Sequence, residues 1–313
     1  MIILITGVHG FVGLNLVESL APNHTIYGLD IVAPVKAGVL KTFAWDDLDK
    51  GEMPTMDTII HLAGKAHDTK NQSAAQVYFD INTGLTQKIY DYFLTSSAKK
   101  FIFFSSVKAA ADTVDGDILT ENVIPNPKGP YGESKILAEK YIQENPPKPD
   151  SGKKVYILRP CMIHGPGNKG NLNLLFSVVS KGIPWPLGAF TNRRSFTSVG
   201  NLCFVIDGFV SGNIESGIFH MADDEALSTN ELIEVMCEAM GRKARIWHLP
   251  KGLMNFVAQL GGALHLPLNP ERLRKLTENY VASNAKIKNA LGIKQMPISA
   301  REGLKQTIVS FLK

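Results

Sequence analysis

Short apolar runs alternate with stretches of helical hydrophobic spacing through the first half of the chain. The runs have the length and continuous apolar character of strands buried on both faces, and they cover residues 2–5, 25–29, 58–62 and 100–104. Apolar positions recur every three or four residues over residues 11–20, 74–94 and 131–143. This alternation predicts an α/β fold, in which a doubly wound parallel sheet carries helices on both faces.

The second half of the chain is less regular. After a Pro-rich stretch at 145–149, residues 155–158 return to the sheet, and glycines and prolines then crowd residues 165–188. The later segments are a short stretch at 220–222, a helix near 228–240, strand-like residues 244–249 and a final helix at 301–312. We expect one domain at 1–160, with returning strands and crossings to about residue 222, and a smaller mixed C-terminal domain mainly at 161–313.

Composition and charge exclude several classes of protein. Of the 313 residues, 44% are hydrophobic and 20% are charged, which is typical of a folded globular chain. The formal net charge is +4 without a dense basic run, so we expect no nucleic-acid partner. The cysteines are three and widely spaced, so neither a disulfide framework nor a metal site is indicated, and a reducing cytoplasm is the expected location.

No segment has the pattern of a signal peptide or of a membrane span. The first residues run straight into glycines, and no uninterrupted apolar run approaches the roughly 18 residues that a spanning helix needs. The nearest candidate, residues 253–268, is interrupted by Asn255, Gln259, His265 and a Gly261-Gly262 pair. We expect a core or lid helix there, and contact with a membrane surface or a lipid tail is the alternative.

Three glycines follow the first apolar run with the spacing G-x-x-G-x-x-G. They are Gly7, Gly10 and Gly13, and they stand where the first strand should turn into the first helix. Glycine allows a sharp turn and a close approach to a pyrophosphate, whose charge is favoured at a helix N-terminus. Asp30 ends the second apolar run, where a carboxylate can bind the ribose hydroxyls and would repel a 2′-phosphate. The pattern predicts a Rossmann-type domain that binds NAD rather than NADP, the alternative being a plain strand-to-helix turn.

A serine, a tyrosine and a lysine stand where they could act on one substrate oxygen. Ser106 follows the apolar run at 100–104, while Tyr131 and Lys135 lie four residues apart on one face of a predicted helix. We expect the ammonium of Lys135 to lower the pKa of Tyr131, which makes the phenol a usable general acid/base. The Ser106 hydroxyl can hydrogen-bond the same substrate oxygen, although capping of a helix is its alternative role.

Together these residues resemble the extended short-chain dehydrogenase/reductases of the nucleotide-sugar epimerase/dehydratase type, over nearly the whole chain. Further matching motifs are His61-Leu62-Ala63-Gly64 and Leu158-Arg159-Pro160. The resemblance implies an NAD-dependent enzyme with Ser106, Tyr131 and Lys135 as its catalytic residues. The cofactor contacts that it implies are Gly7, Gly10, Phe11, Val12, Gly13, Asp30, Ile31, Asp47, Leu48, Leu62, Ala63, Gly64, Asn82, Tyr131, Lys135 and Pro160.

The same resemblance implies a diphosphate-linked sugar as the substrate and a homodimer formed through a helix bundle. Arg193-Arg194-Ser195-Phe196 resembles the segment whose arginine grips the diphosphate, and a planar guanidinium suits that task. Arg194 is the better aligned of the two arginines, with a surface salt bridge as its alternative role. The substrate contacts implied are Lys108, Asn171, Arg194 and Arg272, with Arg274 as an alternative to Arg272.

Departures from the family pattern reduce the number of reactions and substrates that we expect. Dehydratases of this type carry an Asp-Glu pair after the catalytic Ser/Thr, where this chain has Val107-Lys108, so dehydration is disfavoured. Met162 stands where many epimerases have an asparagine, and Ala109-Ala110-Ala111 replaces a Val-Tyr-Gly segment. These departures, with residues 105–108 and 193–199, resemble a bacterial subgroup that acts on N-acetylated hexosamines linked to a nucleotide or to a polyprenyl diphosphate.

We therefore expect hydride transfer at C4 of a diphosphate-linked hexose of the UDP-N-acetyl type, through a 4-keto intermediate. Asp30 favours retained NAD and hence an epimerase. An NAD(P)H-dependent 4-keto-sugar reductase of surface polysaccharide synthesis is the alternative. A non-catalytic NAD-binding scaffold on the same fold is a third hypothesis, which the presence of both Tyr131 and Lys135 disfavours.

Overall fold

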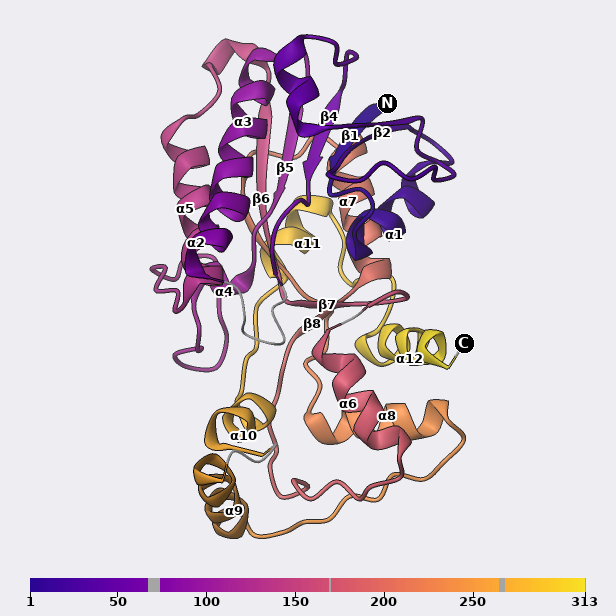
Figure 1. The fold of residues 1–313 in the computed structure, drawn as a ribbon, viewed down its shortest axis with the longest axis vertical. Helices are drawn as coiled ribbons and strands as arrows, with labels where there is room; N and C mark the ends of the chain where they lie inside the picture. The colour runs from indigo at the N-terminus through magenta and orange to yellow at the C-terminus, as the bar shows by residue number, and fades with distance from the viewer. Residues whose placement is uncertain (67–73, 169, 265–267, 313) are drawn as a thin grey trace.

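A seven-stranded parallel sheet forms the centre of the larger part of the molecule (Figure 1). The computed structural model describes residues 1–66, 74–168, 170–264 and 268–312. The strands, in the order in which they neighbour one another, are β3 (Lys41–Phe43), β2 (Thr25–Leu29), β1 (Ile2–Thr6), β4 (Thr58–His61), β5 (Lys100–Phe104), β6 (Lys154–Pro160) and β9 (Gly217–Met221). Every neighbouring pair is parallel, which confirms the predicted α/β, Rossmann-type doubly wound fold.

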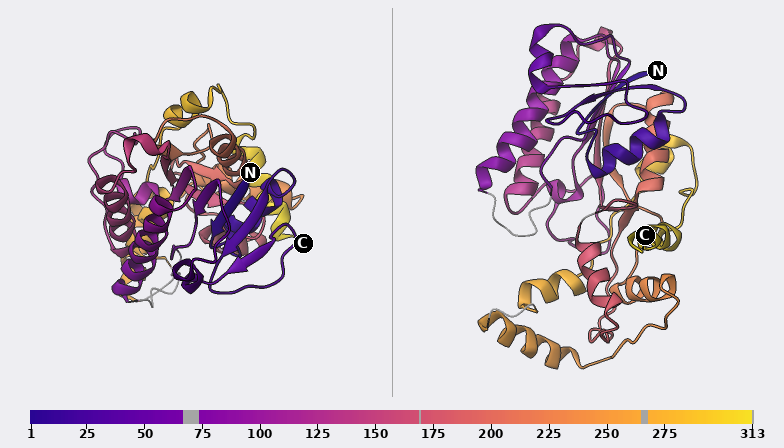
Figure 2. Two further views of the ribbon diagram at one scale, coloured as in Figure 1. Left: turned by 90° about the horizontal axis from the view of Figure 1, so that it is seen from above. Right: turned by 45° about the vertical axis from the view of Figure 1, so that its right-hand side comes forward.

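Helices cover both faces of this sheet, as the views in Figures 1 and 2 show. One face carries α1 (Phe11–Leu20), α7 (Val199–Ser211) and α11 (Ala285–Leu291). The other carries α2 (Ala75–Tyr78), a π-helical segment at Phe79–Gly84, α3 (Leu85–Thr95) and α5 (Pro130–Glu144). The chain therefore returns to the sheet long after residue 160, through α7, β9 and α11, and the expected division into two domains stays a prediction.

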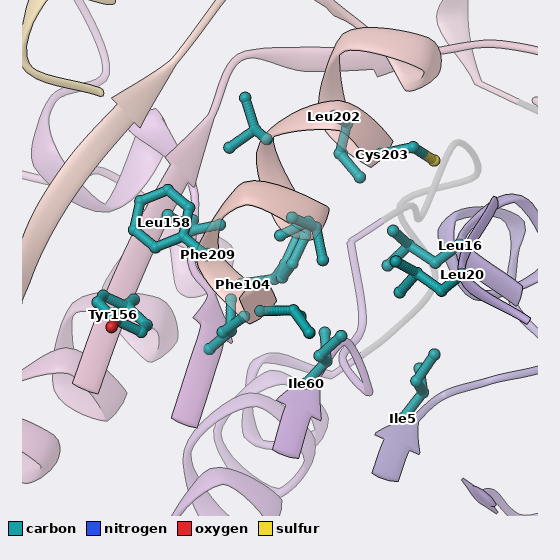
Figure 3. Packing of buried hydrophobic residues seen from close by; sticks show 14 of the residues in the cluster. Ile5, Leu16, Leu20, Ile60, Phe104, Tyr156, Leu158, Leu202, Cys203 and Phe209 are labelled. Carbon is teal, nitrogen blue, oxygen red and sulfur yellow. The ribbon is translucent and has the colours of Figure 1, made fainter. Parts of the chain in front are cut away.

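Figure 3 shows the packing between α1, α7 and the sheet. Leu16 and Leu20 of α1 face Leu202 and Cys203 of α7, and all four side chains are buried. The strands contribute Ile5, Ile60, Phe104, Tyr156 and Leu158 to the same cluster. Other side chains of these strands are buried on the opposite face, which explains why the strands read as continuous apolar runs.

The remaining elements form a smaller part at the other end of the molecule (Figure 1). Its elements are a two-stranded parallel sheet of β7 (Met162–His164) and β8 (Phe196–Ser198), and the helices α6 (Asn171–Ser180), α8 (Thr229–Ala239), α9 (Lys251–Ala263), α10 (Pro270–Thr277) and α12 (Ala300–Phe311). They share a second hydrophobic cluster that includes Trp185, Phe196 and Leu304. This part contains little sheet, in agreement with the irregular sequence pattern.

Several element boundaries differ from the predictions. The strand-like residues 244–249 form isolated bridges at Ile246 and His248 instead of a regular strand. β3 and a following 3₁₀ turn at Trp45–Lys50 were not predicted, because three residues are too few to show a hydrophobic pattern. The predicted helix over 74–94 is present from Ala75 to Thr95, with a π-helical segment in its middle.

The described residues contain neither a membrane-spanning helix nor a cluster of metal ligands. Across the described ranges, no helix combines the length and the apolar character that a membrane crossing requires. In that same part of the chain, no group of three or more His, Cys, Asp or Glu side chains is arranged to hold a metal ion. Cys161, Cys203 and Cys237 are unpaired and buried.

Candidate active site

The glycine turn lies at the sheet edge where the carboxyl ends of β1 and β4 meet. Gly7 has a φ of +67°, and a Cβ there would stand 2.9 Å from the Ala63 backbone nitrogen. A Cβ on Gly13 would stand 2.5 Å from the Val8 carbonyl oxygen. Only glycine lets the turn close this tightly, and the first turn of α1, capped by Gly10, carries no acidic side chain. A pyrophosphate fits these groups, because the free N–H groups of a helix N-terminus favour an anion.

The carboxylate of Asp30 is tied to the glycine turn. It accepts hydrogen bonds from the backbone N–H of His9 at 3.1 Å and of Ile31 at 2.8 Å. The Ile31 side chain is exposed beside it, whereas Phe11 and Val12 are partly buried against the core at the start of α1. The acid predicted to bind a ribose is therefore held next to the turn predicted to bind the pyrophosphate.

The carboxylate of Asp47 forms its hydrogen bonds within its own 3₁₀ turn. Its carboxylate accepts a hydrogen bond from the Ala44 N–H at 2.9 Å and one from Lys50 at 2.7 Å, and the Lys50 contact lowers its pKa. The neighbouring Leu48 is buried in the core. Asp47 closes this turn in the structure, and its contact with a cofactor stays a prediction.

A buried histidine joins β1, β4 and α3 beneath the site. His61 Nδ1 lies 2.7 Å from the Thr6 hydroxyl, and its Nε2 lies 2.9 Å from the Thr86 hydroxyl. Because Thr86 donates its own proton to the Asn82 carbonyl, it must accept from Nε2–H, which makes Nδ1 the acceptor of the Thr6 hydroxyl. Burial, together with the nearby Lys135, lowers the pKa of His61 well below its usual value. His61 is thus a neutral structural ring.

Asn82 joins the loop after β4 to the catalytic helix. Its Oδ1 accepts the Lys65 N–H at 2.8 Å, and its Nδ2 donates to the Lys65 carbonyl at 3.1 Å and to the Ser134 hydroxyl at 2.9 Å. A Cβ on Gly64 would stand 2.9 Å from Asn82 Oδ1 and 3.1 Å from Lys135 Nζ. The structure therefore brings together Gly64, Asn82 and Lys135, three residues that the sequence assigned to one site. Asn82 lies in the π-helical segment, a deviation that is frequent at functional sites.

The Ser106 side chain acts on the phenol of Tyr131 and lowers its pKa. Ser106 caps α4 (Val107–Ala110), where its hydroxyl also accepts the Lys108 N–H at 3.2 Å. Tyr131 is the second residue of α5, which starts at Pro130, and its ring packs edge-on against Tyr78 with centroids 6.5 Å apart. Ser106 thus has the capping role that was its alternative, and its bond to the substrate oxygen stays a prediction.

The pKa of Tyr131 does not move in the expected direction. Burial of the phenol raises its pKa, and this effect exceeds the lowering by the Ser106 side chain. The expectation that Lys135 brings about a net lowering is therefore wrong for the protein alone. The physical reason is desolvation, which disfavours a phenolate more than one hydroxyl donor stabilises it.

Lys135 is buried one helical turn after Tyr131 on α5. Its ammonium donates to the Phe104 carbonyl at 2.8 Å and lies 5.0 Å from the centre of the Phe103 ring. Burial lowers its pKa to about 8, against an opposing effect of Glu139. At neutral pH the ammonium is therefore still mostly charged, and it is held at the end of β5.

Arg194 and Lys108 converge on Tyr280, a buried residue that sequence reasoning missed. Arg194 donates to the Lys275 carbonyl oxygen, and burial lowers its pKa. Lys108 binds the backbone and side chain of Asp112, and its ammonium lies 4.5 Å from the centre of the Tyr280 ring. Both cations act on Cys161, although burial dominates and raises the pKa of that thiol to about 12. The two predicted substrate cations thus share one neighbourhood although 86 residues separate them.

The other predicted substrate residues lie on α6 and α10. Arg272 is exposed in the first turn of α10, whereas Arg274 lies 3.9 Å from Asp112, the carboxylate that also binds Lys108. The structure therefore favours Arg274 over Arg272 as a neighbour of the other cations. Asn171 begins α6, and its side chain lies outside the described residues. Pro160 is buried at the end of β6.

A buried ion pair joins α5 to β6. Glu139 of α5 accepts two hydrogen bonds from Arg159 Nε, at 2.9 and 3.2 Å, and one from its Nη2 at 2.6 Å. Ser105, next to Ser106, donates to the same carboxylate. Sequence reasoning missed Glu139. It stands four residues after Lys135, as Lys135 does after Tyr131, and this repeated spacing could have placed it on the same face of the helix.

Comparisons with known proteins agree with this geometry. A sequence model described as "NAD dependent epimerase/dehydratase family" matches residues 3–210. A UDP-glucose 4-epimerase of Vibrio cholerae is 32% identical, over 99% of this chain and 95% of the relative. An N-acetyl-alpha-D-glucosaminyl-diphospho-ditrans,octacis-undecaprenol 4-epimerase of Escherichia coli O157:H7 is 28% identical, over 91% of this chain and 84% of the relative. A solved UDP-N-acetylglucosamine 4-epimerase from Bacillus cereus has the same fold, with a TM-score of 0.75 at 19% identity over 100% of this chain and 99% of that one.

Proposed function

The chain belongs to the NAD-dependent epimerase/dehydratase family of enzymes, and we propose that it epimerises a diphosphate-linked N-acetylhexosamine at C4. The observation that carries the proposal is the Ser106 side chain acting on the Tyr131 phenol, one helical turn before the buried ammonium of Lys135 on α5. Position C4 is supported by the names of both curated relatives, and the N-acetyl group by the name of the second. The residues after Ser106 support epimerisation over dehydration, because Val107 is buried and Lys108 is held by Asp112.

The protein's own residues account for the proton transfers. NAD held in the glycine turn supplies a reversible hydride acceptor. Tyr131 removes the proton from the C4 hydroxyl and later returns a proton to the oxygen of the 4-keto sugar. The Ser106 hydroxyl stabilises the phenolate and the substrate oxygen in turn, and the positive charge of Lys135 favours the deprotonated phenol. Burial raises the pKa of Tyr131 in the protein alone, so the phenolate needs this stabilisation to act as the base.

The diphosphate is assigned to the cations around Tyr280. Arg194 can present its planar guanidinium to two oxygens at once, and Lys108 adds a point charge. Each now binds an oxygen of the protein itself, Arg194 the Lys275 carbonyl and Lys108 the Asp112 carboxylate. A diphosphate would replace these internal acceptors, so the two cations are already placed to receive it.

A panel of substrates tests the proposal. The purified protein is given UDP-N-acetylglucosamine, UDP-glucose and a polyprenyl-diphosphate-linked N-acetylglucosamine, without added cofactor, and NMR identifies the product. We expect the C4 epimer of at least one N-acetylated substrate and no net consumption of NADH. Turnover that needs a 4-keto sugar and consumes NADH would make the protein a reductase, and bound NAD without turnover would make it a scaffold.

Location and assembly complete the proposal. We place the enzyme in the cytoplasm, since its three cysteines are unpaired in the structure. The homodimer implied by the family resemblance is part of the proposal, and light scattering of the purified protein tests it.

A further inference from the structure

Helix α9 exposes a continuous apolar stripe on its outward face. Met254, Ala258 and Gly261 are buried at helical spacing, and Met254 and Ala258 pack in the same hydrophobic cluster as Leu273 of α10. A second stripe beside it also has helical spacing, and its side chains are 40–67% exposed: Leu253, Phe256, Val257, Leu260 and Leu264. An ordinary surface helix is apolar only on its inward face, so this outward stripe needs a separate explanation.

The chain around this stripe is basic and free of acids. Between Glu238 and Glu271 the sequence contains no Asp or Glu. In the same interval Arg242, Lys243, Arg245 and Lys251 are all exposed. Trp247 lies among these cations with 56% of its surface exposed, a residue type favoured at the boundary between lipid and water. Glu271 of the neighbouring helix α10 is paired with Lys275, so an apolar stripe preceded in the chain by these cations complements an anionic lipid surface.

The position of α9 in the molecule suits contact with a flat surface. Figures 1 and 2 show α9 at the end remote from the seven-stranded sheet, next to α10. α9 has 13 residues, which gives a length of about 20 Å, less than the roughly 30 Å of a bilayer core. The helix can therefore lie in the headgroup region but is too short to cross the bilayer. α10 connects it to the substrate end, because Lys275 of α10 is bonded to Arg194 and Arg274 lies beside Asp112.

We propose that the outward face of α9, with the basic residues before it, docks the protein on an anionic membrane surface. Leu253, Phe256, Val257 and Leu260 enter the boundary between headgroups and acyl chains, while Lys243, Arg245 and Lys251 contact lipid phosphates. A second copy of the chain is a poorer occupant, because a symmetric contact would bring the same cations together. The proposal goes beyond the epimerase function and does not depend on the identity of the sugar carrier.

Co-sedimentation of the full chain with lipid vesicles tests this proposal. We expect binding to vesicles that contain phosphatidylglycerol, weak binding to pure phosphatidylcholine, and release by high salt. The double variant Phe256→Ser/Leu260→Ser should bind about tenfold or more weakly, because it removes apolar contacts from the centre of the stripe. The variant Lys243→Gln/Lys251→Gln should lose affinity mainly at low salt.

A matched double variant separates docking from general apolar exposure. Phe204→Ser/Val309→Ser removes two side chains, each 40% exposed, from α7 and α12. It should bind vesicles like the wild type, and every variant should keep its thermal unfolding temperature and its NAD binding. The proposal is overturned if the wild type does not bind anionic vesicles, or if the α9 and control variants bind equally. It is also overturned if the wild type dimerises in solution and the α9 variant does not, since a second copy then covers the stripe.

Discussion

The cofactor end of the sheet and the substrate end of the molecule are built in different ways. At the cofactor end, Gly7, Asn82 and Lys135 are each fixed by neighbours on the sheet or on the helices packed against it. At the substrate end, Arg194 and Lys108 contact oxygens of the protein that a ligand could replace. The residues proposed for the chemistry thus lie on rigid elements, whereas those proposed for substrate recognition have partners that a ligand could replace.

This difference separates reaction from specificity. A hydride and a proton must be transferred over short distances, so the groups at the sheet edge have little freedom. The sugar and its carrier differ among relatives that share the fold, and the cations that would meet them lie on loops and short helices. We therefore expect changes at the first end to affect kcat and changes at the second to affect KM.

The largest expected effect comes from Tyr131→Phe. Removing the hydroxyl that accepts and returns the proton should lower kcat by about 10²–10⁴-fold. NAD binding should persist, because the ring still packs against Tyr78. Steady-state kinetics and a cofactor titration measure the two quantities. Unchanged kcat would show that another group is the base.

The next effect is on stability, at the ion pair below the catalytic helix. Arg159→Met leaves the buried Glu139 carboxylate without its main partner and should lower the free energy of unfolding by about 3–5 kcal/mol. Urea unfolding measures the loss. The double variant Arg159→Met/Glu139→Leu is the control, since removing both charges should recover part of the stability. Equal stability of the wild type and the single variant would contradict this role of the pair.

A smaller effect is expected at the substrate end. Arg194→Lys keeps the charge but loses the planar donor pair, so KM should rise about tenfold with a smaller change in kcat. Arg193→Lys is the matched control, because Arg193 is exposed and adjacent in the chain. If the two variants have the same KM, Arg194 does not bind the diphosphate.

The smallest expected effect is on stability at acidic pH, and it comes from His220, a second buried histidine. Burial lowers the pKa of His220 from its usual 6.5 to about 4, so the folded protein keeps this ring neutral where the unfolded chain protonates it. Its contribution to stability is therefore complete above pH 6.5 and is lost as the pH falls toward 4. Thermal unfolding between pH 7.5 and 4.5 measures the slope. His220→Leu should have a shallower slope, and an identical slope would exclude His220 as a cause.

The cofactor end could be predicted from the sequence because its signals are local. Each of its motifs lies within one element or at its end: the glycine spacing, Asp30 after a strand, and the Tyr131–Lys135 interval. The order of strands and helices follows from the hydrophobic periodicity. The direction of the Tyr131 pKa could not be predicted in this way. It depends on burial by neighbours such as Tyr78, which no spacing reveals.

The substrate end could not be predicted from the sequence, because the residues in contact there are far apart in the chain. Tyr280 meets Lys108 and the Ala111 carbonyl across about 170 residues, and its burial follows from the whole fold. The outward stripe of α9 was visible as an apolar run, but its orientation was not, since an inward and an outward stripe have the same periodicity. Three-dimensional placement was needed in both cases.

The most direct test of the account follows a deuterium atom placed at C4 of UDP-N-acetylglucosamine. The central claim is that hydride leaves C4 and returns to the same carbon on its other face while Tyr131 exchanges the hydroxyl proton. NMR and mass spectrometry of the product should show the C4 epimer with its deuterium retained at C4. An epimer that has lost the label to solvent, or a dehydrated product, would contradict the claim.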